Sequence, residues 1–157
     1  MPILDLKDFK AAIAPKKRIL AVDHGTKTLG LATSDESFMV ATPLKTIGRT
    51  KFSKDLIAFK QVITDHDIGG IILGLPLNMD GSEGPRCQSV RQFAENLEKG
   101  LDAALPISFW DERLSTSAVE RFLIDEVDMS RAKRGKVVDT LAALHILQGA
   151  LDRLAML

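Results

Sequence analysis

The sequence predicts an α/β domain in which a mixed five-stranded sheet, three antiparallel strands followed by two parallel ones, is flanked by helices. Two apolar runs, at residues 19–22 and 71–75, are typical of strands that are buried on both faces. A further apolar stretch follows the first run so closely that the spacing predicts a hairpin. Later in the chain, strand-like runs alternate with helical spacing, which indicates parallel strands joined by helical crossovers.

The first elements are predicted from capping and turn residues. Asp5 is a helix-capping residue, and we expect a short amphipathic helix that ends near Pro15 and packs at an edge of the fold. The hairpin pairs residues 19–22 with residues 29–32, and its turn is expected near residues 25–28.

The third strand is predicted over residues 38–47, at an edge of the sheet, because Pro43 cannot donate a hydrogen bond to a neighbouring strand. Apolar periodicity predicts the remaining elements: a helix over 52–67, a strand over 69–76, a helix over 86–101, a strand over 105–110, a helix that begins at Ser115 or Thr116, a polar loop over 129–135 and a last helix over 137–154. Right-handed crossovers leave few topologies for this order. The RNase H-like arrangement fits best, with one extra helix at the N-terminus and one near the end.

The composition limits the class of protein. A length of 157 residues fits one domain over residues 1–157, of which residues 1–17 are an N-terminal helical extension. The 21 basic and 21 acidic residues cancel, so a site for nucleic acid must be a local patch. Cys87 is the only cysteine, which excludes internal disulfides and fits a reducing compartment. Because no apolar run approaches about 20 residues and no secretory segment is recognisable, we expect a cytoplasmic protein with no membrane partner.

Acidic residues interrupt apolar surroundings at three places. Asp23 ends the first buried strand, Asp111 and Glu112 end the last strand, and Asp139 lies in the first turn of the last predicted helix. The carboxyl ends of neighbouring parallel strands share one edge of a sheet, and a helix packed across that edge could bring a further carboxylate to it. The alternative is that each acid is only a turn or helix-start residue.

Converging carboxylates repel one another unless a cation lies between them. Mg²⁺ and Mn²⁺ suit such a site, because hard divalent ions take oxygen ligands and tolerate an incomplete protein cage. Two such ions about 4 Å apart can activate a water and stabilise a leaving oxygen during phosphodiester cleavage. The acidic positions therefore predict a site for Mg²⁺ or Mn²⁺ and hydrolysis of a phosphodiester bond.

Basic residues are expected near the same edge of the sheet. Lys27 lies at the predicted hairpin turn, Arg113 follows the last strand, and four more precede the helix of Asp139, namely Arg131, Lys133, Arg134 and Lys136. Lysine and arginine bind phosphates without reading sequence, although a charge run in a loop is also ordinary solvated surface. One tryptophan and no tyrosine favour recognition of the shape or backbone of structured nucleic acid over base stacking.

Four ordered motifs resemble those of the YqgF (RuvX-like) family: LAVDHGTKTLGLA at residues 20–32, GLPLNMDGS at 74–82, DERLST at 111–116 and KVVDTLAA at 136–143. The resemblance covers about residues 18–154. Members of this family are bacterial RNase H-fold proteins described as pre-16S rRNA nucleases and as Holliday-junction resolvases. The resemblance implies that the catalytic, metal-binding acids are Asp23, Glu112 and Asp139, with Asp111 and Arg113 nearby. It also implies a cytoplasmic role in ribosomal RNA maturation.

The sequence departs from the wider superfamily at one strand. Many RNase H-like nucleases have an acid at the end of the strand that corresponds to residues 71–75, but here that strand runs into proline, and the next carboxylate is Asp80 in the loop. Glu112 would then substitute from the neighbouring strand. His24 occupies a position where the family more commonly has an aromatic residue, and it should point to the face opposite Asp23 in a structural role.

We therefore expect a metal-dependent endonuclease, monomer or homodimer, that acts on structured RNA, with precursor 16S rRNA in ribosome biogenesis as the favoured substrate. In this hypothesis Asp23 and Asp139 hold the metal, Glu112 ligates it or orients the water, and Lys27 and Arg113 hold phosphates. One alternative is a Holliday-junction resolvase that acts on branched DNA, for which two symmetric nicks require a dimer. Another is a non-catalytic factor that binds nucleic acid or pre-ribosomal particles. An actin-like sugar or acetate kinase is disfavoured, because those enzymes bind nucleotide between two such domains.

Overall fold

The computed structural model describes residues 3–101, 105–114 and 131–157, with the side chains of Leu114 and of residues 131–139 outside this description. The helix predicted to begin at Ser115 or Thr116 lies outside the described residues.

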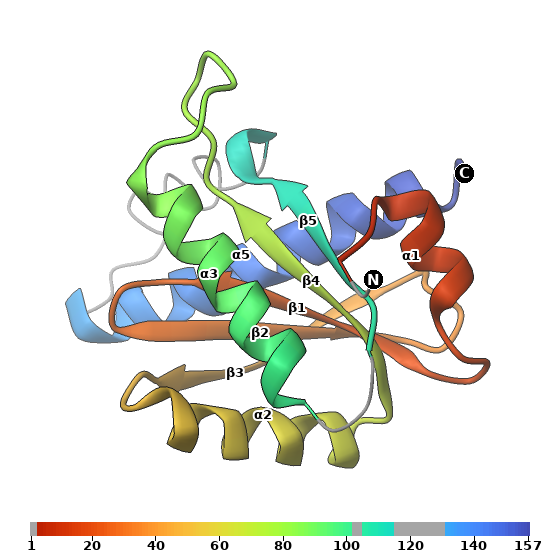
Figure 1. Cartoon of the computed structure of the whole chain (residues 1–157), viewed down its shortest axis with the longest axis horizontal. Helices are drawn as coiled ribbons and strands as arrows, with labels where there is room; N and C mark the ends of the chain where they lie inside the picture. The colour runs from red at the N-terminus through yellow and green to blue at the C-terminus, as the bar shows by residue number, and fades with distance from the viewer. Residues whose placement is uncertain (1–2, 102–104, 115–130) are drawn as a thin grey trace.

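The described residues form a five-stranded mixed sheet in the order β3-β2-β1-β4-β5 (Figure 1). Its strands β1 and β2 pair antiparallel, as do β2 and β3, whereas β4 is parallel to both β1 and β5. The bounds are β1 at Arg18–His24, β2 at Thr28–Ser34, β3 at Ala41–Gly48, β4 at Ile68–Leu75 and β5 at Ile107–Asp111. This is the predicted RNase H-like sheet, and β3, which contains Pro43, lies at one edge as expected.

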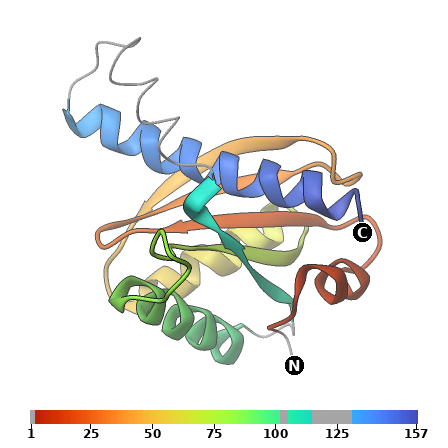
Figure 2. The ribbon, with the colours of Figure 1, turned by 90° about the horizontal axis from the view of Figure 1, so that it is seen from above.

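Helices cover both faces of the sheet (Figures 1 and 2). On one face α2 (Phe52–Asp65) and α3 (Pro85–Gly100) pack over a core that contains Phe59, Phe93 and Leu97. On the other face α5 (Arg131–Leu154) packs with α1 (Leu6–Ala12) over a second apolar cluster. None of the described helices is long and apolar enough to cross a membrane.

The N-terminal helix agrees with its prediction. The carboxylate of Asp5 accepts a hydrogen bond from the backbone N–H of Asp8 at 2.9 Å and so caps α1. Ile3, just before this helix, forms a bridge to Ile107 of β5, the other edge strand. Phe9 is fully buried against the face of the sheet that α5 covers. The extension therefore packs at an edge of the fold.

Two predicted boundaries are wrong. The last helix extends at least from Arg131 and does not begin near residue 137, so residues 131–135 of the predicted polar loop form helical turns. Arginine, lysine and alanine are strong helix formers, and a segment without apolar periodicity does not reveal this. The third strand begins at Ala41, because Phe38 has φ 59° and the Asp35 carboxylate accepts hydrogen bonds from two backbone N–H groups in the preceding turn.

Successive side chains of β1 pack on opposite faces of the sheet. Leu20 and Val22 belong to the core under α2 and α3, whereas Ile19 and Ala21 belong to the cluster under α5. Because successive side chains of a strand point to opposite faces, Asp23 continues the α5 side and His24 the other side.

Candidate functional site

Asp23 lies near the carboxyl end of β1, half-buried, on the face that α5 covers. Its antiparallel partner on β2 is Gly30. On the other side, β1 runs parallel to β4 with Val22 opposite Leu73, so the next position along, Gly74, lies beside Asp23. Neither neighbouring strand therefore places a side chain next to the Asp23 carboxylate.

The space above Gly74 is taken by Glu112. A Cβ built on Gly74 would overlap the Oε1 atom of Glu112 and would lie 2.5 Å from Cδ1 of Ile146 on α5. Glu112 begins a short 3₁₀ turn, Glu112–Leu114, directly after β5, and its side chain turns back over β4. Because adjacent strands lie about 4.8 Å apart, Glu112 covers a position one strand away from Asp23. Two carboxylates that are far apart in sequence thus share the α5 side of one edge.

The helix α5 touches the row of the sheet that contains Asp23. This row runs from Thr46 on β3 through Gly30 and Asp23 to Gly74 and Trp110. The hydroxyls of Thr140 and Thr46 are 3.0 Å apart, Ile146 contacts Gly74, and Trp110 lies 2.9 Å from a Cβ built on Gly149.

The position of Asp139 on α5 is known from the backbone alone. It immediately precedes Thr140 and lies two turns, about 10 Å of helix, before Ile146. The predicted third acid therefore lies, by its backbone, on the helix that crosses the Asp23 row.

Asp111 and Arg113 pair with each other. The Arg113 Nη2 atom donates to Asp111 Oδ2 at 2.6 Å, and the backbone N–H of Arg113 donates to Asp111 Oδ1 at 3.0 Å. These hydrogen bonds hold the pKa of Asp111 below its usual value. Arg113 also donates to the carbonyl of Met79, which ties the loop after β4 to this edge.

The predicted phosphate-binding residues are only partly placed by the structure. Lys27 is exposed in the turn between β1 and β2. Arg113 is exposed, with its charge matched by Asp111. The other four, Arg131, Lys133, Arg134 and Lys136, lie in the first turns of α5 with undescribed side chains.

His24 points to the face opposite Asp23, as predicted. It is 5 % exposed, and its ring centroid lies 4.8 Å from that of Phe93 on α3. Burial, together with the charges of Arg49 and Arg86, lowers the pKa of His24 to about 4, so the ring is neutral at pH 7. The two arginines were not predicted from the sequence, because they meet His24 only where β1, α3 and the β3–α2 connection come together.

The two glycines that flank Asp23 were also not predicted as part of the site. Glycine is disfavoured inside a strand, so its presence in buried strands is a signal that something approaches closely. This signal is available in the sequence at Gly30 and Gly74, but the pairing register is needed to show that both face Asp23.

The residues described around Asp23 suit a hard cation. Carboxylate oxygens are the ligands that Mg²⁺ and Mn²⁺ prefer, and the glycine at position 74 lets the Glu112 carboxylate lie one strand away from Asp23. Among the described side chains, no group of three or more His, Cys, Asp or Glu residues is arranged to hold a metal ion. The side chain of Asp139 lies outside the described residues.

The chain is similar to one protein family over nearly its whole length. The family model "RuvX: Holliday junction resolvase" matches residues 17–153. A protein of Roseobacter denitrificans named "Putative pre-16S rRNA nuclease" is 51% identical over 157 residues, which is 100% of this chain and 96% of the relative. A protein of Ruegeria sp. (strain TM1040) with the same name is 55% identical over 148 residues, 94% of this chain and 92% of the relative.

Solved structures share the fold at low sequence identity. One is the Thermus thermophilus RuvC in complex with a Holliday junction substrate, with TM-score 0.52 and 12% identity over 87% of this chain and 95% of that chain. Another is the yeast mitochondrial Holliday junction resolvase Ydc2, with TM-score 0.52 and 11% identity over 96% of this chain and 86% of that chain.

Proposed function

Because the chain belongs to the RuvX family, we propose that it is a nuclease that hydrolyses phosphodiester bonds in structured RNA, with precursor 16S rRNA as its substrate. The names of the relatives support this substrate, since they are about half identical to the chain over nearly all of its length. Maturation of ribosomal RNA would place the protein in the cytoplasm.

One observation supports a reaction site at Asp23. Asp23 is flanked by glycine on both neighbouring strands, and the Glu112 carboxylate lies over one of those glycines. Carboxylates are brought together at the open end of a sheet at a cost, because they repel each other. A bound divalent ion would offset that repulsion, which is why this arrangement favours metal-dependent chemistry.

In this proposal Asp23, Glu112 and Asp139 hold Mg²⁺ or Mn²⁺. When bound, such an ion would supply Lewis-acid chemistry for activating a water and stabilising the leaving oxygen. Asp23 on β1 and Asp139 on α5 would bind the ion, and Glu112 would ligate it or orient the water. Lys27 and Arg113 hold phosphates of the substrate, and so do Arg131, Lys133, Arg134 and Lys136 at the start of α5.

A second candidate substrate is branched DNA. The family description names Holliday junction resolution, and the Thermus thermophilus RuvC structure contains such a junction. This function would require a homodimer, because two symmetric nicks need two sites. A non-catalytic role in ribosome assembly is the alternative in which the fold binds nucleic acid without cutting it.

The test is a side-by-side cleavage assay on precursor 16S rRNA and on a four-way DNA junction, with and without Mn²⁺. We expect cleavage of the rRNA that requires the ion and falls at least about 100-fold in Asp23→Asn. The matched control is Asp65→Asn, which makes the same change at an exposed position of α2.

The outcomes separate the candidates. Cleavage of the junction alone would assign the resolvase function. Wild-type activity in folded Asp23→Asn would remove the site proposed here. Full complementation of a depleted cell by Asp23→Asn would favour the non-catalytic role.

A further inference from the structure

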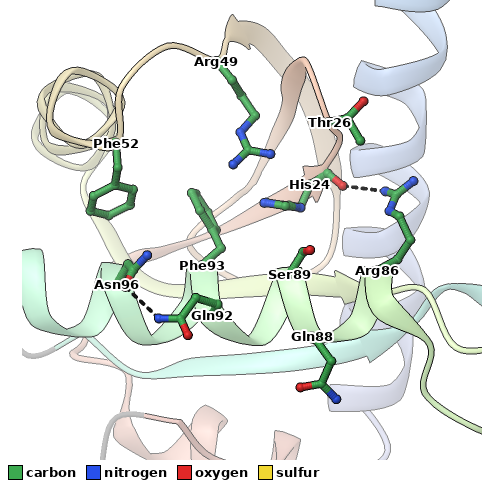
Figure 3. A pocket seen from close by; sticks show the side chains of 10 residues that line it. All are labelled: His24, Thr26, Arg49, Phe52, Arg86, Gln88, Ser89, Gln92, Phe93 and Asn96. Atoms are coloured by element: carbon green, nitrogen blue, oxygen red, sulfur yellow. Dashed lines mark hydrogen bonds between the residues drawn. The ribbon is translucent and has the colours of Figure 1, made fainter.

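A cavity of ≈ 550 Å³ lies on the side of the sheet opposite Asp23 (Figure 3). Its lining comes from the end of β1, the β3–α2 connection, the start of α2 and one face of α3. In Figure 3 the side chains of His24, Arg49 and Phe93 point toward one another across this space. The cavity is therefore built from segments that only the fold brings together.

Two arginines give the cavity positive charge. Arg49 donates from Nη1 to the carbonyl of Gly25 at 2.7 Å, and Arg86 donates from Nη2 to the carbonyl of His24 at 2.9 Å. Both partners are uncharged carbonyls, and no acidic residue is among the described residues that line the cavity. Each guanidinium has five N–H donors in a planar fork, so donors remain for an anion.

His24 is the second, independent sign of a ligand. Its Nδ1 and Nε2 atoms are both buried, and neither has a hydrogen-bond partner among the described residues. Buried polar groups in proteins are nearly always paired, and an unpaired one needs an explanation. A neutral imidazole offers one donor and one acceptor, and the edge of a nucleic acid base carries groups of both kinds.

The remaining lining fits a nucleotide better than a bare ion. The partly buried ring of Phe52 at the start of α2, which packs edge-on against Phe93, offers an aromatic face on which a base can stack. Ser89 and Asn96 on α3 add hydroxyl and amide groups that can bind the edge of a base. A cation is excluded by the two guanidiniums.

We propose that this cavity binds one nucleotide, with its phosphate on Arg49 and Arg86, its base against Phe52 and a polar edge of the base hydrogen-bonded to His24. This inference depends on the proposed function in one respect: it assumes that the phosphate belongs to a nucleic acid strand or to a free nucleotide. A strand that reaches both this cavity and Asp23 passes the β1–β2 turn, where Lys27 is exposed. The backbone N–H of Arg49 donates to the carbonyl of Lys27, so the cavity adjoins that turn directly.

The test measures binding to the full chain in the Asp23→Asn background, without divalent ions, so that no cleavage occurs. The probes are a five-nucleotide single-stranded RNA, uridine monophosphate and a polyglutamate peptide. We expect Arg86→Gln to weaken RNA binding about tenfold and to lower the salt dependence of log K by about one. The matched control is Lys99→Gln, which removes the same charge from an exposed position of the same helix.

The probes distinguish the source of the phosphate. Weaker binding of both uridine monophosphate and RNA to Arg86→Gln assigns a free nucleotide site, and weaker binding of RNA alone assigns a contact with the substrate strand. Equal effects of Arg86→Gln and Lys99→Gln overturn the proposal, as does polyglutamate binding with the same dependence on Arg86.

A nuclear magnetic resonance experiment localises the probe. On addition of the RNA, we expect the ring resonances of His24 to shift while those of His145, exposed on α5, stay unchanged. Unchanged His24 resonances at saturating RNA overturn the proposal even if cleavage by the wild-type chain is normal. Conversely, the His24 resonances could shift although the wild-type chain cleaves no substrate. That result would support nucleotide binding in the cavity and would reject the proposed nuclease reaction.

Discussion

Two consecutive residues at the end of β1 face opposite environments. Asp23 lies under α5 beside two glycines and near the carboxylate of Glu112, whereas His24 lies under α3 between two arginines. The sheet separates an acidic side from a basic side within one step of the backbone. The end of one strand can therefore present a cation-binding residue on one face and an anion-binding residue on the other, because successive side chains point to opposite faces of the sheet.

We expect the largest change in activity from a substitution on the acidic side of the sheet. We expect Glu112→Gln to lower the rate of Mn²⁺-dependent rRNA cleavage at least about 100-fold, because it removes a negative oxygen from the proposed metal site. The matched control, Glu95→Gln, changes an exposed acid on α3 and should keep the wild-type rate. Equal rates for wild type and Glu112→Gln would show that the two faces do not differ in the way proposed.

The basic side is tested by the pH dependence of stability. The folded-state pKa of His24 is about 4, against 6.5 for an ordinary histidine, so the unfolded chain binds more protons between these values. As the pH falls from 7 to 4, the free energy of unfolding should therefore fall, with His24 contributing up to about 3 kcal/mol.

The variant His24→Phe isolates this contribution. It keeps a ring against Phe93 and has no titrating group, so its free energy of unfolding should fall less over the same pH range. Urea unfolding at a series of pH values, without divalent ions, measures the difference. Parallel curves for the two proteins would show that His24 is not held neutral by its surroundings.

A smaller change fills the space between Asp23 and Glu112. Gly74→Ala should lower the free energy of unfolding by about 1–3 kcal/mol, since the added Cβ meets Glu112 and Ile146, and cleavage should fall with it. Gly48→Ala is the control, because a Cβ at Gly48 has nothing within 4 Å. Urea denaturation and the rRNA cleavage assay measure both effects. Equal stability of the two variants would mean that Glu112 does not lie over β4.

The smallest expected effect concerns how α5 is held above the Asp23 row. Thr46→Val removes the hydroxyl that lies 3.0 Å from that of Thr140, and we expect it to cost about 1 kcal/mol of unfolding free energy. Thr42→Val makes the same change at an exposed position of the same strand and should cost less. Thermal unfolding of the two variants measures the difference, and equal costs would show that this contact contributes nothing to the placement of α5.

Much of the fold was predictable, because apolar runs and turn residues act locally. The buried runs of β1 and β4, the Asp5 cap and the edge position of Pro43 all follow from side-chain size and backbone chemistry within a few residues. The start of α5 was missed because its first turns have no apolar stripe, and the start of β3 because a carboxylate cap replaces strand pairing there.

At the site, the candidate carboxylates and the opposite orientations of Asp23 and His24 could be predicted before any coordinates were known. Those conclusions need only charge, apolar context and the two-residue period of a strand. Tertiary structure alone decided that Gly30 and Gly74 flank Asp23, that Glu112 folds back over β4, and that Arg49 and Arg86 meet His24. The physical reason is that pairing register and helix packing join residues far apart along the chain, and no local pattern encodes those distances.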